Sequence, residues 1–203
     1  MSHVLQVFNP LVLHGLHTLS DADFARFCAD NRKLRIERYG PDDIRIMSPT
    51  FFLTTRLNQE IIRQLSNWHH QHRLGYVGES NAGYQLEPSV MLSPDASWIS
   101  EERIAGLTRT QREDEFLPAC PDFVIELKSK SDRLPTLRQK MNRWLHYGVR
   151  LGWLLDPATR TTYVYRPGQA AQTLKGFGRI LDAAPELPDF ALDLTELERE
   201  MER

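Results

Sequence analysis

Apolar positions along the chain predict three helices of unequal length. Phe24, Phe27 and Cys28 give one apolar face after Ser20, whose side chain suits a helix N-cap. Apolar residues at three- and four-residue steps predict a long helix with one buried face, and a later helix that stops at Gly148. The predicted helices cover about residues 20–31, 48–72 and 133–147.

Short apolar or alternating runs predict strands between and after these helices. They lie at residues 34–38, 43–47, 76–79, 83–87, 95–99, 123–128, 149–156 and 161–165. Phe123–Lys128 is almost continuously apolar, which indicates burial on both faces. Residues 101–118 are polar and aperiodic, so we expect a long connection with one helical turn. Further short strands and a terminal helical segment complete the expected elements.

The order of these elements predicts an α/β fold with a mixed sheet. The helix at about 133–147 joins two strands, and a strand–helix–strand crossover implies that they are parallel. Most other connections suit antiparallel neighbours. At 203 residues we expect a single domain over 1–203, with a core at about 20–195 and an acidic C-terminal segment at 185–203.

Composition narrows the class of protein without naming a function. Hydrophobic residues make up 41% and charged residues 26%, as in ordinary globular domains. No apolar run approaches the roughly 18 residues of a membrane span, and the N-terminus lacks a basic region followed by an apolar core. Cys28 and Cys120 fit no metal-binding spacing and are expected to be small buried side chains. We therefore expect a cytoplasmic protein.

Charge is unevenly distributed although the net charge is only -2. Residues 128–150 hold seven basic side chains against one acid, whereas residues 185–203 hold seven acids against two arginines. A local basic block is what binding of a polyanion would require, while the net charge argues against coating of nucleic acid by bulk electrostatics. A solvated helix face would explain the same cations equally well.

Candidate chemistry lies at the end of the apolar strand. Glu126 and Lys128 are two apart, so their side chains point to the same face. A carboxylate can bind a divalent cation, and a lysine beside it can hold a phosphate oxygen or an attacking water. Asp95 and Asp122 are the candidate second acids, but Asp122 lies about 13 Å from Glu126 at strand rise. A plain Glu–Lys surface pair remains the alternative.

Several motifs occur together in one order. They are Met47-Ser48-Pro49, Ser93-Pro94-Asp95, Pro121-Asp122-Phe123-Val124-Ile125-Glu126, Ser129-Lys130-Ser131-Asp132, Leu137-Arg138-Gln139-Lys140, Tyr147-Gly148-Val149, Trp153-Leu154-Leu155-Asp156-Pro157 and Val164-Tyr165-Arg166. This combination resembles the bacterial family of restriction endonucleases of largely unknown function within the PD-(D/E)XK nuclease superfamily. The resemblance covers about residues 20–195 and implies a restriction-endonuclease-like αβββαβ core.

The resemblance also implies roles for individual residues. Asp95 and Glu126 would be metal ligands for Mg²⁺ or Mn²⁺, and Lys128 the catalytic lysine. Glu37 and Gln139 are candidates for supporting roles, with a surface strand residue and a solvent-facing helix residue as the respective alternatives. Asp122 is expected to be structural, near the entry of its strand. The residues expected to contact nucleic-acid phosphates are Lys130, Arg133, Arg138 and Lys140. The implied substrate is nucleic acid, with DNA favoured over RNA. Cleavage of both strands would favour a homodimer.

Two other functions stay open at this point. A nuclease fold without activity would act as a nucleic-acid-binding or assembly module, since a fold does not guarantee its chemistry. A zinc site at His69, His70 and His72 is the second alternative, and the spacing of His69 and His72 is suitable on a helix. A serine hydrolase is disfavoured because the chain has no Gly-x-Ser-x-Gly motif.

Overall fold

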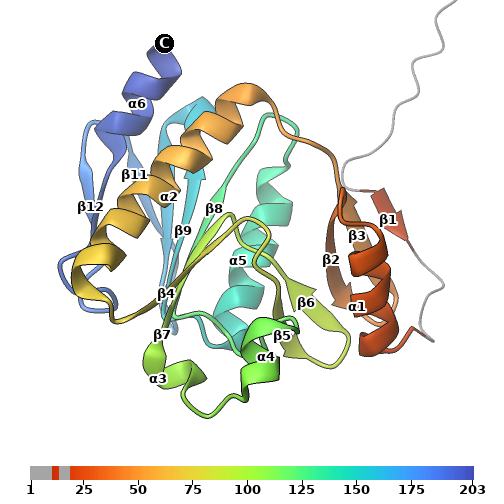
Figure 1. The fold of residues 1–203 in the computed structure, drawn as a ribbon. Coiled ribbons are helices and arrows are strands. Elements are labelled where there is room, and N and C mark those ends of the chain that lie inside the picture. Colours follow the sequence, from red (N-terminus) through yellow and green to blue (C-terminus); the bar gives the residue numbers. More distant parts are fainter. Residues whose placement is uncertain (1–10, 14–18) are drawn as a thin grey trace, which may run out of the picture.

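The computed structural model describes residues 11–13 and 19–203 (Figure 1). Its helices are α1 (Asp21–Asp30), α2 (Phe52–His72), α3 (Glu101–Ile104), α4 (Arg109–Glu113), α5 (Leu134–Tyr147) and α6 (Leu194–Glu202). The three long helices expected from the sequence are confirmed. The region 101–118, expected to hold one helical turn, contains the two short helices α3 and α4.

Thirteen strands lie in the described residues. They are β1 (Leu11–Leu13), β2 (Arg35–Gly40), β3 (Asp43–Met47), β4 (Gly75–Glu79), β5 (Tyr84–Glu87), β6 (Val90–Leu92), β7 (Ala96–Ser100), β8 (Phe123–Leu127), β9 (Leu151–Asp156), β10 (Thr161–Tyr165), β11 (Gln172–Lys175), β12 (Ile180–Asp182) and β13 (Ala191–Asp193). β1 and β6 were not predicted, because three apolar residues give too short a run to show a period.

The strands form two main sheets and one small one. The larger sheet has the order β11-β10-β9-β8-β7-β4, and the second sheet has the order β1-β3-β2-β6-β5. β8 and β9 are parallel and joined by α5, as the crossover predicted, whereas the other strand pairs are antiparallel. The fold is therefore a mixed α/β arrangement in one domain, which confirms the expected fold class.

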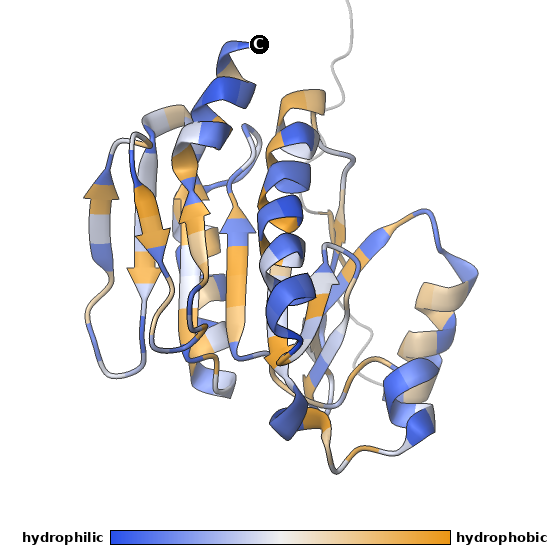
Figure 2. Ribbon diagram, turned by 60° about the vertical axis from the view of Figure 1, so that its left-hand side comes forward, coloured by the Kyte–Doolittle hydropathy of each residue, from blue (hydrophilic) through white to orange (hydrophobic). Residues whose placement is uncertain are grey.

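Helices cover both faces of the larger sheet. Leu57, Ile61 and Leu65 of α2 pack with Leu194 and Leu197 of α6 in the core on one face. Met141 and Trp144 of α5 pack on the other face. The central strands are correspondingly apolar along most of their length (Figure 2). Burial of β8 on both faces is thus confirmed. Glu126, near its carboxyl end, is a charged residue within this buried strand.

The second sheet meets the larger one at a short connection. Residues 93–95 link β6 of the second sheet to β7 of the larger sheet. α1 covers the second sheet through Phe24, which packs with Ile36, Ile44 and Met91. The connection brings β2 toward the carboxyl end of β8, and the polar residues of interest gather there. Within the described part of the chain, no helix combines the length and apolarity needed to cross a membrane.

Candidate active site at the junction of two sheets

Glu126 is the buried acid at the centre of the site. It is the fourth residue of β8 and only 2% of its surface is exposed. Its Oε1 accepts a hydrogen bond of 2.8 Å from Nε1 of Trp144 and lies 2.9 Å from Nζ of Lys140. Oε2 accepts from the same ammonium at 3.2 Å. Because β8 alternates its side chains, Glu126 faces α5, which supplies both donors.

Asp95 lies beside Glu126 although the two are 31 positions apart in the sequence. It precedes β7, and its backbone N–H donates to the carbonyl of Ile125 at 3.1 Å. Its Oδ2 accepts a hydrogen bond of 2.8 Å from the backbone N–H of Leu127. Antiparallel pairing of β7 with β8 therefore brings the start of one strand, just after Asp95, to the end of the other, where Glu126 lies.

Lys140 occupies a cradle of oxygen atoms. Its ammonium donates to Oε1 of Glu37 at 2.8 Å, to the carbonyl of Ser93 at 2.8 Å and to Glu126. An ammonium has three N–H donors, so these three partners use all of them. The Glu37 carboxylate is fixed from its other side by the hydroxyl of Tyr39, which donates to Oε2 at 2.8 Å. Glu37 thus belongs to the site rather than to a surface strand.

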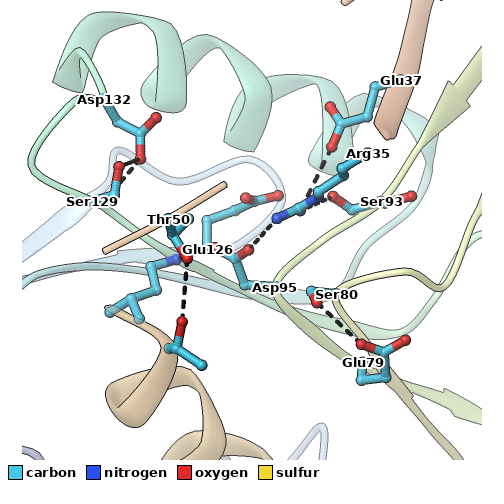
Figure 3. A network of polar contacts seen from close by, with 12 residues as sticks. Arg35, Glu37, Thr50, Glu79, Ser80, Ser93, Asp95, Glu126, Ser129 and Asp132 are labelled. Carbon is cyan, nitrogen blue, oxygen red and sulfur yellow. Dashed lines mark hydrogen bonds and ion pairs between the residues drawn. The ribbon is translucent and has the colours of Figure 1, made fainter. Parts of the chain in front are cut away.

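Arg35 closes the network from the second sheet (Figure 3). Its Nη1 lies 2.8 Å from Oδ1 of Asp95, and its Nη2 donates to the carbonyl of Ser93 at 3.0 Å. Nη2 is also 3.7 Å from Oε1 of Glu37. Three carboxylates and two cationic side chains therefore share one buried cluster, which carries a single net negative charge when all five groups are ionised.

Burial and neighbouring charges shift the pKa values of this cluster. Burial raises the pKa of Glu126 to about 7, with Asp95 and Glu37 adding to the rise while Lys140 opposes it. Burial by itself would lower the pKa of Lys140, but the charges of Glu126 and Glu37 outweigh it, so that pKa is raised. Lys140 therefore stays protonated, whereas Glu126 takes up a proton more readily than an ordinary glutamate.

Lys128 directly follows β8 and is partly exposed. Its ammonium donates to the carbonyl of Ser129 at 3.2 Å, while its backbone N–H donates to the carbonyl of Leu155. The next turn is held by Asp132, whose Oδ2 accepts from the backbone N–H of Ser129 at 2.8 Å and from its hydroxyl (Figure 3). This loop fixes the backbone at Lys128, whose side chain stays partly exposed.

Two expectations about α5 differ from the structure. Lys140 was expected among the phosphate-contacting cations, but its side chain is only 7% exposed and is bound to carboxylates. Gln139 was expected near the site, yet it is exposed, because one helical step turns it about 100° away from Lys140. Lys130, Arg133 and Arg138 are exposed as expected, and Arg138 lies over the ring of Tyr163.

Asp122 serves the opposite end of β8. Its Oδ1 lies 2.8 Å from Nε of Arg103 and 3.4 Å from Nη1 of Arg150, and its Oδ2 accepts from the backbone N–H of Ser100. These contacts tie the entry of β8 to its two neighbours in the sheet. The side chain therefore has the structural surroundings that the sequence analysis expected for it.

Sequence reasoning missed Arg35, Ser93 and Trp144 as parts of the site. The sequence did contain a signal for the contact of Arg35 with Glu37 and for a buried partner of Lys140. Arg35 stands two residues before Glu37, so both side chains share one face of β2. On α5, Lys140 falls within the apolar stripe beside Met141 and Trp144, and a charged residue in a buried stripe calls for a partner. The identity of that partner depends on residues far away in the sequence.

The donor chemistry of the cluster suits a hard divalent cation. Its donors are carboxylate and carbonyl oxygens, and two resident cations already occupy positions among them. Among residues 11–13 and 19–203, no three His, Cys, Asp or Glu form a group that could hold a metal by themselves. Mg²⁺, however, is commonly held by one or two carboxylates with water and substrate phosphate. Asp95 and Glu126 supply two carboxylates of that kind, and each of their four oxygens has a hydrogen-bond partner in the cation-free protein.

The zinc alternative gains no support from the helix that carries the histidines. His69, His70 and His72 lie at the end of α2, and within residues 11–13 and 19–203 they form no group of three side chains that could hold a metal. The ring of His72 stacks on Trp68 at 5.4 Å between centroids. His72 is thus a residue at the end of α2 whose ring packs on the core tryptophan Trp68.

Comparisons with known proteins show the family to which this chain belongs. A search of curated proteins gave no match. Among solved structures, the chain is similar to a protein from Anabaena variabilis whose title describes a "putative nuclease belonging to DUF820". The two share 18% identity and a TM-score of 0.69, over 90% of this chain and 98% of that chain, which shows a common fold. The model of the Uma2 family, described as "Putative restriction endonuclease", matches residues 21–195, and this chain therefore belongs to that family.

Proposed function

We propose that this protein hydrolyses phosphodiester bonds of DNA in a reaction that depends on Mg²⁺ or Mn²⁺. The observation that carries the proposal is the meeting of Asp95 and Glu126 on adjacent strands. The Asp95 carboxylate accepts the N–H of Leu127, the residue between Glu126 and Lys128. Two acids and a partly exposed lysine at the end of a buried strand are the side chains that such a reaction requires.

Asp95 and Glu126 would hold the cation. Bound there, it would polarise the scissile phosphate and stabilise the leaving oxygen. The raised pKa of Glu126 means that this carboxyl group carries a proton more readily than an ordinary glutamate. A positive ion beside it favours the ionised form, so cation binding and loss of that proton are coupled.

Lys140 and Trp144 hold Glu126 in place. The ammonium of Lys140 has used its three donors on Glu37, Ser93 and Glu126, so it has none left for substrate. The indole N–H of Trp144 fixes Oε1 of Glu126. These side chains orient the acid and offset its burial, and we assign them a positioning role.

Lys128 is the lysine that would act on the reacting atoms. Its ammonium has one hydrogen bond, to the carbonyl of Ser129 at 3.2 Å, and rotation of a flexible side chain can release it. It would then hold the attacking water or the negative charge that develops on the phosphate. This assignment follows the resemblance and agrees with the difference in exposure between Lys128 and Lys140.

DNA would be held by exposed cations that follow the catalytic strand. Lys130, Arg133 and Arg138 are exposed and suited to backbone phosphates, which position DNA without reading its sequence. Cleavage of both strands requires two sites, so we also propose that the protein acts as a homodimer. Sedimentation with and without duplex DNA tests this assembly, and a strictly monomeric complex would exclude it.

The direct test combines cation binding with DNA cleavage. Wild-type protein, Asp95→Asn and Glu126→Gln are titrated with Mn²⁺ by calorimetry and incubated with supercoiled plasmid. We expect both variants to lose Mn²⁺ affinity at least tenfold and to lose nicking. Glu113→Gln, which removes an exposed acid paired with Arg109, should match wild type. Equal Mn²⁺ affinity in all four proteins would contradict the assignment.

A second candidate function is a DNA-binding module without hydrolysis. The observation in its favour is that Arg35 and Lys140 already neutralise much of the acidic cluster. Such a protein would bind DNA through Lys130, Arg133 and Arg138 without any response to Mn²⁺. The same calorimetric titration separates the two functions, because only the nuclease needs a cation at Asp95.

A further inference from the structure

Arg35 differs from Lys140 in how firmly it is held. Its side chain is 25% exposed, whereas that of Lys140 is 7% exposed. Arg35 is the first residue of β2, so its backbone lies at a strand end. Its Nε is buried without a hydrogen-bond partner among the described atoms, although both Nη atoms are bonded. The Nε–H is therefore a buried donor that is unsatisfied in this arrangement.

The guanidinium stands where a cation held by Asp95 would be repelled. Nη1 is 2.8 Å from Oδ1 of Asp95, and the other carboxylate oxygen is engaged by the backbone N–H of Leu127. That backbone donor is fixed by the pairing of β8, so the oxygen that can be released is Oδ1. Two positive charges sharing one carboxylate oxygen in a partly buried site repel each other strongly. Of the two resident cations, Arg35 is the one that borders solvent.

We propose that Arg35 leaves Asp95 when a divalent cation binds, and then binds a phosphate oxygen of the DNA backbone. This inference rests on the proposed function. Arginine suits the second role because its planar fork matches two phosphate oxygens at once. The satisfied donors of Lys140 prevent it from moving in the same way. Arg35 thus neutralises the acids in the cation-free protein and becomes a substrate-positioning residue once the cation is present.

The consequence is a positive coupling between cation and DNA. If the cation frees Arg35 for phosphate, Mn²⁺ should raise the affinity for DNA, and DNA should raise the affinity for Mn²⁺ by the same factor. Replacing Arg35 should remove its share of that factor. It should also strengthen Mn²⁺ binding without DNA, because the resident competitor is gone.

The test uses affinities rather than cleavage. Binding of a fluorescent duplex with phosphorothioate linkages is measured by anisotropy with and without Mn²⁺, and Mn²⁺ binding is measured alone by calorimetry. Wild type is compared with Arg35→Gln, with Arg35→Lys as a charge-preserving variant that keeps the fold, and with Arg109→Gln as an exposed-arginine control. We expect Mn²⁺ to raise wild-type affinity for the duplex about tenfold or more.

The outcomes separate this inference from the proposed function. A coupling reduced several-fold in Arg35→Gln and Arg35→Lys, but unchanged in Arg109→Gln, supports it. An equal coupling in all proteins overturns it while leaving the nuclease assignment intact. Absence of Mn²⁺ binding to wild type overturns both. A crystal soaked in Mn²⁺ gives an independent readout, and an ion at Asp95 with Arg35 still bonded to Oδ1 would also overturn the inference.

Discussion

Lys140 donates a hydrogen bond of 2.8 Å to Glu37 across 103 positions of the sequence. This contact joins α5, which packs on the larger sheet, to β2 of the second sheet. The same ammonium lies 2.9 Å from Oε1 of Glu126, so one cation holds acids from both sheets. The packing of the two sheets and the shape of the candidate site therefore depend on each other.

The two lysines should give opposite phenotypes. Lys140→Met leaves two buried carboxylates without their main cation, so we expect the free energy of unfolding to fall by about 3–5 kcal/mol. Lys128→Met should leave stability within about 0.5 kcal/mol of wild type and lower the rate of DNA cleavage by roughly 100-fold or more. Urea unfolding and plasmid nicking measure the two effects. A stable, inactive Lys140→Met beside an active Lys128→Met would reverse the assignment.

Trp144 should contribute more through its indole N–H than other buried tryptophans. Trp144→Phe removes the donor to Oε1 of Glu126, and a hydrogen bond to a charged group contributes about 1.5–3 kcal/mol. Trp98 is the matched control, since it is buried and its Nε1 has no partner among the described residues. We expect Trp144→Phe to destabilise the protein by about that amount more than Trp98→Phe. Equal losses in urea unfolding would contradict the role given to this bond.

Asp122 and Asp95 should be separable by their effects on stability and on cation binding. Asp122→Ala strands the buried part of Arg103 and removes the acceptor for Ser100, so a loss of about 3–5 kcal/mol is expected. Its Mn²⁺ affinity, measured by calorimetry on the folded protein, should equal that of wild type. Asp95→Asn should instead lose Mn²⁺ affinity. A loss of Mn²⁺ binding in Asp122→Ala with retained stability would exchange the two roles.

The pH dependence of stability should carry the signature of Glu126. Its pKa in the folded protein is about 7, above the ordinary value of 4.5, so the folded state binds this proton more tightly than the unfolded state. Its contribution to stability is therefore complete below pH 4.5, falls as the pH rises toward 7, and is constant above that. Urea unfolding in EDTA should show this decline in wild type relative to Glu126→Gln. A pH-independent difference between them would refute the shifted pKa.

DNA binding should depend on salt through the exposed cations of the loop after β8 and of α5. Each phosphate contact that is lost should make the slope of log K against log salt shallower by about 0.9. We expect this for Lys130→Gln and for Arg133→Gln, both of which remove exposed charges. Arg109→Gln, on α4, serves as the control. Anisotropy titrations at several salt concentrations measure the slopes, and unchanged slopes in both variants would remove this loop from the DNA interface.

Local sequence was sufficient for most of the elements and for naming Asp95 and Glu126 as candidate acids. The apolar steps of α2 and α5 and the continuous run of β8 are short-range patterns, and burial follows directly from them. Glu126 was visible because a charge at the end of an apolar strand is unusual. Asp95 could be joined to it because antiparallel neighbours place the start of one strand beside the end of the next.

Only the tertiary structure decided which cations serve those acids. Lys128 and Lys140 are equally basic in the sequence, yet one lies at the protein surface and the other among carboxylates. Burial of a charge is favourable only when partners surround it, and the partners of Lys140 come from β2, from residue 93 and from β8. Arg35 joined the site for the same reason. Local periodicity carries no information about such distant partners, so the acids could be predicted while their counter-charges had to be observed.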